Sequence, residues 1–105
     1  MLDADKIYSE IVRTAKDWAV ADEKWRSLKE TDGIVLAEIA NHMEGSSHAE
    51  RKFKALASPE YKLHKVNLVA AKTEANIKLA MYKAVQNLSE LRRSEESTRR
   101  AEMKL

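Results

Sequence analysis

The sequence predicts an all-α protein, an antiparallel helical bundle with one long C-terminal helix, assembled into an oligomer. The composition is helical, because 34% of the 105 residues are charged and only two are glycine and one is proline, too few for the turns of an all-β fold. Apolar residues recur at helical spacing along most of the chain. Neither glycine nor proline occurs in residues 60–105, so one helix can fill that stretch. The length predicts a single domain over residues 1–105.

The first helix is expected over residues 4–28. One face carries a seven-residue repeat of apolar and small residues, namely Ile11, Trp18 and Trp25, with Thr14, Ala21 and Leu28 three residues further on each time. Such a repeat forms a seam along one side of a helix. Residues 29–33 include a glycine and indicate a break or bend after this helix.

Two short helical segments are expected next, over residues 36–43 and 49–57. Ser47 is followed three residues later by a glutamate. This is the spacing of a capping box, in which the hydroxyl accepts a bond from a free amide at the helix start. The helical spacing predicts that Phe53 and Leu56 face inward.

The long helix is predicted to begin at the triplet Ser58, Pro59, Glu60. Serine is a favoured N-cap, proline is tolerated at the first helical position, and an acidic residue in the first turn suits the helix dipole. At 1.5 Å per residue such a helix is about 65 Å long. We therefore expect its end either to fray or to reach into a partner.

The long helix carries two apolar stripes. The first consists of Leu63, Val66, Ala70, Ile77, Met81, Ala84, Leu88 and Leu91. The second lies nearly opposite and consists of Tyr61, Leu68, Ala75, Leu79 and Tyr82. Because a surface helix needs only one apolar face, we expect the first stripe to pack on the preceding helices and the second to form the interface of a homo-oligomer.

Charges are distributed unevenly along the chain. Residues 1–50 carry six basic and eleven acidic side chains, a net charge of −5, whereas residues 51–105 carry thirteen basic and six acidic side chains, a net charge of +7. Such asymmetry indicates either a polyanionic partner or pairing between the acidic and basic halves of neighbouring subunits. Both explanations remain open at this point.

A row of basic residues leads into the long helix and follows it. The candidate phosphate contacts are Arg51, Lys52, Lys54, Lys62, Lys65, Lys72, Lys83, Arg92, Arg93, Arg99 and Arg100. Cations spaced along a rod suit a phosphate backbone, because each neutralised phosphate releases counterions. Phe53, Tyr61 and Tyr82 are candidates for base stacking. The alternatives are a solvated lysine face over aromatic core residues and, at the C-terminus, arginines paired with Glu95 and Glu96.

The composition argues against several functions. Without cysteine there is no disulfide, thiolate metal site or cysteine nucleophile, and His42 and His48 are too far apart for a helical metal site. Neither a phosphate-binding glycine loop nor a nucleophile elbow is present. We therefore expect no enzymatic activity, metal or cofactor. We also expect a cytoplasmic protein without a membrane partner, since the sequence has no long apolar run.

The later part of the chain resembles small helical proteins of tailed bacteriophages, and its pattern is similar to that of UvsY-type recombination mediators. The resemblance covers residues 35–103 and rests on residues 50–61, on the Ala- and Glu-rich helix that follows, and on the runs 91–94 and 98–103. It implies a non-enzymatic protein that binds single-stranded DNA as a ring of subunits. It further implies a role in helping a recombinase or annealing protein displace a single-strand-binding protein inside a bacterial host. Carried over by position, the implied DNA contacts are Arg51, Lys52, Lys54, Lys62 and Lys65.

Two functions from different classes follow. The first is a recombination mediator that binds single-stranded DNA mainly through phosphates, so its affinity should fall steeply with salt. The alternative is a helical assembly or scaffolding protein that self-associates through its acidic and basic halves without nucleic acid.

Overall fold

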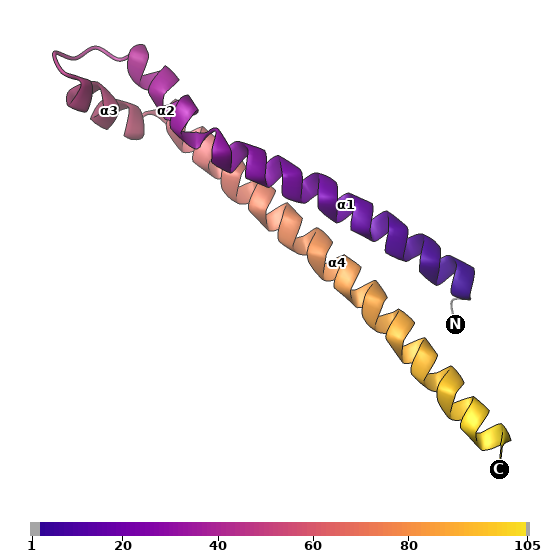
Figure 1. Ribbon diagram of the computed structural model, residues 1–105. Helices are drawn as coiled ribbons and strands as arrows, with labels where there is room; N and C mark the ends of the chain where they lie inside the picture. The colour runs from indigo at the N-terminus through magenta and orange to yellow at the C-terminus, as the bar shows by residue number, and fades with distance from the viewer. Residues whose placement is uncertain (1–2, 105) are drawn as a thin grey trace. The chain divides into compact units, whose positions relative to one another are not determined.

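The structure, a computed structural model, describes residues 3–104, which form four helices and no strand (Figure 1). The helices are α1 (Ala4–Glu30), α2 (Asp32–Asn41), α3 (His48–Leu56) and α4 (Pro59–Met103). The predictions of an all-α fold and of one long C-terminal helix are therefore confirmed. The oligomeric state stays a prediction.

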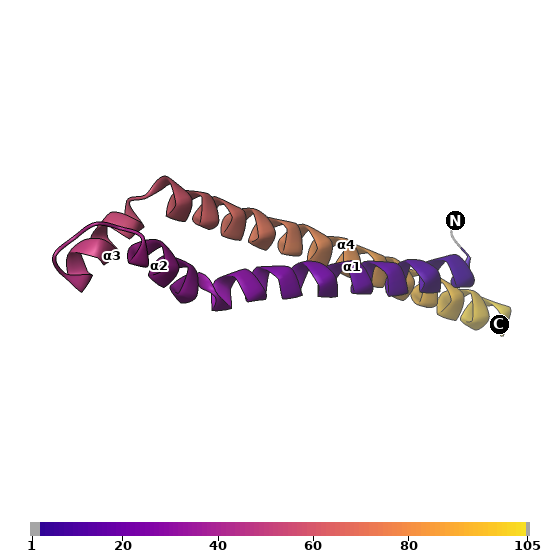
Figure 2. The ribbon, with the colours of Figure 1, turned by 90° about the horizontal axis from the view of Figure 1, so that it is seen from above.

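The chain divides into two compact units, and α1 and α4 each contribute to both. Unit 1 contains the residues up to Val20 and those from Asn76 onward, and unit 2 contains Ala21–Ala75. Within each unit the segments of α1 and α4 run antiparallel (Figures 1 and 2). Unit 1 has ten basic and eight acidic side chains and unit 2 has nine of each, so pairing within the units removes most of the charge asymmetry along the chain. The single domain over residues 1–105 stays a prediction.

The predicted seam on α1 is the packed side of that helix. In unit 1, Ile7 and Thr14 are buried, and Ile11 and Trp18 are half-buried. The Thr14 hydroxyl donates a hydrogen bond of 2.7 Å to the carbonyl oxygen of Glu10, which satisfies this polar group inside the helix pair. In unit 2 the half-buried residues Ala21, Trp25 and Leu28 continue the series.

The roles of the two apolar stripes on α4 are the reverse of those expected. The residues assigned to the oligomer interface are buried or half-buried within the protein: Tyr61, Leu68, Ala75, Leu79 and Tyr82. The stripe expected to pack inward is exposed: Leu63, Val66, Ala70, Ile77, Met81, Ala84, Leu88 and Leu91. Periodicity shows that a helix has two apolar faces but not which one its own chain covers. The interface assignment is therefore wrong for the second stripe.

Capping explains where the helices begin. The Ser47 hydroxyl accepts a hydrogen bond from the Glu50 amide at 3.1 Å, which confirms the predicted cap. The Glu50 carboxylate reaches one residue further back than a capping box requires and bonds the amide of Ser46 at 3.0 Å. At the start of α4, the Ser58 hydroxyl accepts from the Tyr61 amide at 3.2 Å and donates to the carbonyl oxygen of Ala55 at 2.7 Å.

The predicted inward positions of α3 are wrong. Phe53 is 74% exposed and Leu56 is 45% exposed, whereas Ala55 is fully buried. Because successive residues of a helix are turned by about 100°, Ala55 and Phe53 point to nearly opposite sides. The small residue permits close packing of α3, and the large ring is left in solvent.

Candidate nucleic-acid interface

Helix α3 carries an exposed phenylalanine and three basic residues. Lys52 and Lys54 flank Phe53 in the sequence, and all three side chains are exposed. Nζ of Lys54 donates a hydrogen bond of 2.7 Å to the carbonyl oxygen of Glu44, and the Arg51 guanidinium donates one of 3.3 Å to the next carbonyl. These bonds tie α3 to the loop before it.

Lys52 also lines a small cleft between α2 and α3. The cleft has a volume of about 220 Å³, and His48, one turn before Lys52, contributes to its wall together with apolar residues of α2. Lys52 therefore lies at the edge of this largely apolar cleft.

Lys65 of α4 makes inward contacts. Its Nζ lies 3.1 Å from the carboxylate of Asp32, in the first turn of α2, and 5.2 Å from the centre of the Tyr61 ring. Hydrogen bonding to Tyr61 and then to Asp32 raises the pKa of Lys65 above its usual range. The side chain is still 46% exposed, so Lys65 keeps contact with solvent while it joins α4 to α2.

The Asp32 carboxylate contacts three side chains of α4. In addition to Lys65, the Tyr61 hydroxyl donates to it at 3.1 Å, and Nε2 of His64 lies 2.9 Å from it. Partial burial raises the pKa of Asp32, but the hydrogen bonds from Lys65, Tyr61 and His64 outweigh this effect, and the net pKa is below its ordinary value. The sequence analysis missed this cluster, since its members are about 30 residues apart and no local spacing links them.

Lys72 of α4 lies over an indole ring. Its Nζ is 3.7 Å from the centre of the Trp25 ring, with Nζ of Lys29 at 5.2 Å and the Arg26 guanidinium carbon at 5.6 Å. Cations are attracted to the negative face of an aromatic ring at such distances. Of the predicted phosphate contacts on α4 in unit 2, Lys62 is exposed and makes no such contact.

In unit 1 the arginines near the C-terminus are partly paired. The Glu96 carboxylate lies 3.2 Å from Nε of Arg92 and 3.9 Å from the guanidinium of Arg100. The alternative of a self-paired helix end therefore applies to these two arginines. The other predicted phosphate contacts in this unit are exposed, namely Lys83, Arg93 and Arg99.

Two of the three stacking candidates are engaged inside the protein. Tyr61 is only 7% exposed, and the Tyr82 ring stacks on Trp18 with centroids 5.9 Å apart and an interplanar angle of 18°. These contacts contradict their assignment as platforms for bases. Phe53 alone among the three is exposed.

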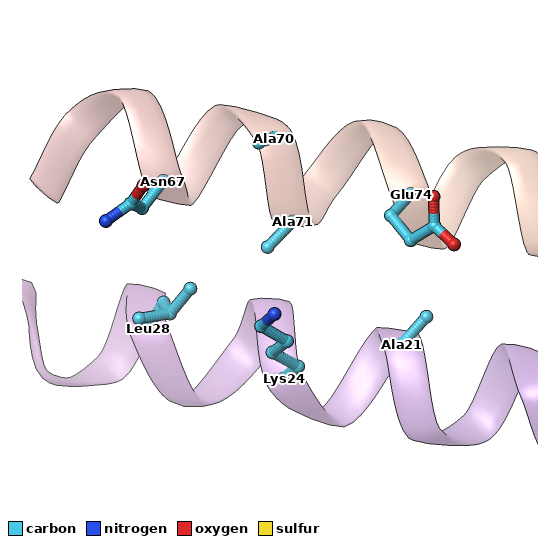
Figure 3. Close-up of a pocket in the computed structure, with 7 residues that line it drawn as sticks. All are labelled: Ala21, Lys24, Leu28, Asn67, Ala70, Ala71 and Glu74. Atoms are coloured by element: carbon cyan, nitrogen blue, oxygen red, sulfur yellow. The ribbon is translucent and has the colours of Figure 1, made fainter. Parts of the chain in front are cut away.

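A cleft in unit 2 lies between α1 and α4 (Figure 3). It has a volume of about 430 Å³ and a floor of alanines, including Ala21 and Ala71. Lys24 and Glu74 contribute its charges, and Leu28 points toward α4. The mixed charge makes this cleft a poor site for a phosphate, because the Glu74 carboxylate would repel it.

The described residues contain no cluster of three or more histidine or acidic side chains that could hold a metal ion. In the same part of the chain, no helix combines the length and apolar character needed to cross a membrane. No family model, curated protein or solved structure matches the chain significantly. The resemblance to UvsY-type mediators therefore stays an expectation, and function must be argued from the geometry of this all-helical protein.

Proposed function

We propose that this protein is a non-enzymatic accessory factor that binds single-stranded DNA and assists a recombinase or annealing protein. The observation that carries the proposal is the exposed Phe53 ring between Lys52 and Lys54 on α3. Single-strand binders combine aromatic rings, on which bases stack, with cations that follow the backbone. Because the Phe53 ring is 74% exposed, a base can stack on it without displacing a side chain of the protein.

Exposed cations are further candidate phosphate contacts in each unit. Lys62 near the start of α4 and the exposed side chains of unit 1 can neutralise phosphates without losing an internal partner. Lys65 cannot do so, because leaving Asp32 would break the cluster that joins α2 and α4. The proposed DNA contacts are therefore Phe53, Lys52 and Lys62 in unit 2 and, separately, Lys83, Arg93 and Arg99 in unit 1. Arg51 and Lys54 are already bonded to carbonyl oxygens of the loop before α3.

Fluorescence anisotropy of a labelled oligo-dT tests the proposal against a duplex of equal length, between about 50 and about 300 mM salt. We expect the single strand to bind more tightly and its affinity to fall steeply with salt. Replacing Phe53 by alanine should weaken binding about tenfold, in the range measured for one stacked base. Leu56→Ala is the matched control, because Leu56 is an exposed apolar residue of the same helix without flanking lysines. Absence of binding at low salt would exclude the function.

A second candidate function, that of a helical assembly protein, is favoured by the exposed stripe on α4. In unit 1 its large members are 39–57% exposed: Ile77, Met81, Leu88 and Leu91. Apolar side chains with spacings of three and four residues fit the packing of another helix. Assembly through this stripe needs no nucleic acid and no pairing between acidic and basic halves.

Sedimentation velocity at low and high salt separates the assembly mechanisms. An oligomer held by the exposed stripe should persist at high salt, whereas one held by acidic and basic halves should dissociate. Leu88→Gln should shift the protein toward monomer, and Asn87→Ser, at the neighbouring exposed position, should not. A monomer under all conditions would exclude assembly through either surface.

A further inference from the structure

Trp25 is a distinctive aromatic residue of unit 2, because positive charges from two helices surround it. Arg26 and Lys29 approach its ring from α1, and Lys72 approaches from α4. The ring is half-buried, so part of it is accessible. The lysine ammonium over the ring, at 3.7 Å, is the nearest of the three cations.

The positive charge around Trp25 is only partly balanced. Arg26 is paired with Asp22, whose carboxylate lies 2.7 Å from its Nε. Within the described residues, Lys29 and Lys72 contact the indole ring but form no ion pair. Two unpaired ammonium groups beside an aromatic face attract an anion that also carries an aromatic ring.

A nucleotide within a single strand has this chemistry, because its base is a planar ring and its phosphate is an anion. We propose that Trp25, Lys29 and Lys72 form a nucleotide subsite for single-stranded DNA, in which a base stacks on the indole and the lysines bind the adjoining phosphates. On binding, the Lys72 ammonium moves from the ring face to a phosphate, which replaces a weak attraction with a charge-assisted hydrogen bond. The subsite rests on the proposed function, and it adds a contact that the exposed Phe53 does not supply.

Tryptophan fluorescence tests the subsite directly, since the chain has only two tryptophans. Trp18→Phe leaves Trp25 as the only tryptophan, and Trp25→Phe leaves only Trp18. Titration with oligo-dT should quench the emission of Trp25 and leave that of Trp18 nearly unchanged, because Trp18 is stacked on Tyr82. Free thymidine monophosphate should quench Trp25 much less, since contacts add up along a strand. Equal quenching by the mononucleotide would overturn the assignment to a strand.

Affinity measurements provide the second readout. We expect Trp25→Ala to weaken oligo-dT binding about tenfold. Lys29→Gln and Lys72→Gln should each make the dependence of log affinity on log salt concentration less steep, by the amount that about one phosphate contact contributes. Lys16→Gln is the matched control, because Lys16 is an exposed residue of α1 with no recorded partner. Circular dichroism of each variant checks that the helices are retained.

The outcomes separate the subsite from the proposed function. Oligo-dT could bind without quenching Trp25, and Trp25→Ala could bind it as tightly as the native protein does. The subsite would then be wrong, and the proposed function would depend on Phe53 alone. If oligo-dT does not bind the native protein at low salt, both proposals are wrong. Loss of affinity in Lys16→Gln equal to that in Lys72→Gln would also overturn the subsite, because general charge would then explain the effect.

Discussion

Two tryptophans seven residues apart on the packed side of α1 have opposite surroundings. Trp18, in unit 1, lies against the ring of Tyr82, whereas Trp25, in unit 2, lies under the ammonium of Lys72. The same residue type at the same position of the helical repeat is thus covered by an apolar ring in one unit and by a charge in the other. What a seam residue does depends on the residue that the antiparallel helix brings opposite it.

The same contrast extends beyond the tryptophans. Unit 1 buries Ile7 and stacks two rings. Unit 2 buries Tyr61 and several alanines, and in addition its helices α2 and α4 are joined by Asp32 and its three polar partners. Apolar contacts are insensitive to pH and are not screened by salt, whereas charged contacts respond to both. The Asp32 cluster of unit 2 should therefore respond to pH, whereas the stacked rings of unit 1 should not.

The largest expected effect is that of truncating the stacked tryptophan. Trp18→Ala should lower the free energy of unfolding by roughly 2–4 kcal/mol, because a half-buried ring and its aromatic partner are lost. Trp25→Ala should cost half of that or less, since a cation covers its ring. Urea unfolding followed by circular dichroism measures both. Equal losses would show that the two tryptophans have the same structural role.

The next largest effect tests the polar centre of unit 2. Asp32→Ala should lower the free energy of unfolding by roughly 1–3 kcal/mol, because it leaves the hydroxyl of Tyr61 and the ring nitrogen of His64 without their acceptor. Asp17→Ala in unit 1 is the control, since Asp17 pairs with Arg13 on the exposed surface and such pairs contribute little. Thermal unfolding of both variants measures the difference. A loss in the control as large as that in Asp32→Ala would contradict the contrast between the units.

Acid should weaken the Asp32 cluster. The pKa of Asp32 is lowered in the folded state, so its contribution to stability is complete above the unfolded value of about 3.9 and disappears as the pH falls through the folded value. Below about pH 4 the melting temperature of the native protein should fall more steeply than that of Asp32→Asn. Glu10 and Glu50, whose pKa values are also lowered, are present in both proteins and cancel in the comparison. Parallel pH profiles would show that Asp32 does not link folding to pH.

The helices, and the packed side of α1, could be predicted from local sequence patterns. The seven-residue repeat containing Ile11, Trp18 and Trp25 marks the covered face of α1, and the Ser58 cap marks the start of α4. These features depend on residues within a few turns of one another. Helix α3 shows the limit, because the pattern did not distinguish Ala55, which is buried, from Phe53, which is exposed.

The candidate site was harder to predict, because its contacts join distant residues. Asp32 and Lys65 are 33 residues apart, and their pairing gives one predicted phosphate contact a partner within the protein. The spacing placed Trp25 on the seam of the first helix, and the lysine opposite it becomes visible only once the antiparallel register of α1 and α4 is known. That register also explains the reversed stripes, since it decides which face of α4 meets α1.

The smallest expected effect compares two serine caps within unit 2. Ser58 is buried and its hydroxyl both accepts from the Tyr61 amide and donates to the carbonyl oxygen of Ala55, so Ser58→Ala should cost about 1–2 kcal/mol. The exposed Ser47 makes one such bond at the start of α3, and water can replace it, so Ser47→Ala should cost roughly 0.5 kcal/mol. Urea unfolding measures both losses. Equal losses of unfolding free energy for the two serines would show that burial does not strengthen the polar contacts of unit 2. The difference between these contacts and the stacked rings of unit 1 would then have another physical cause.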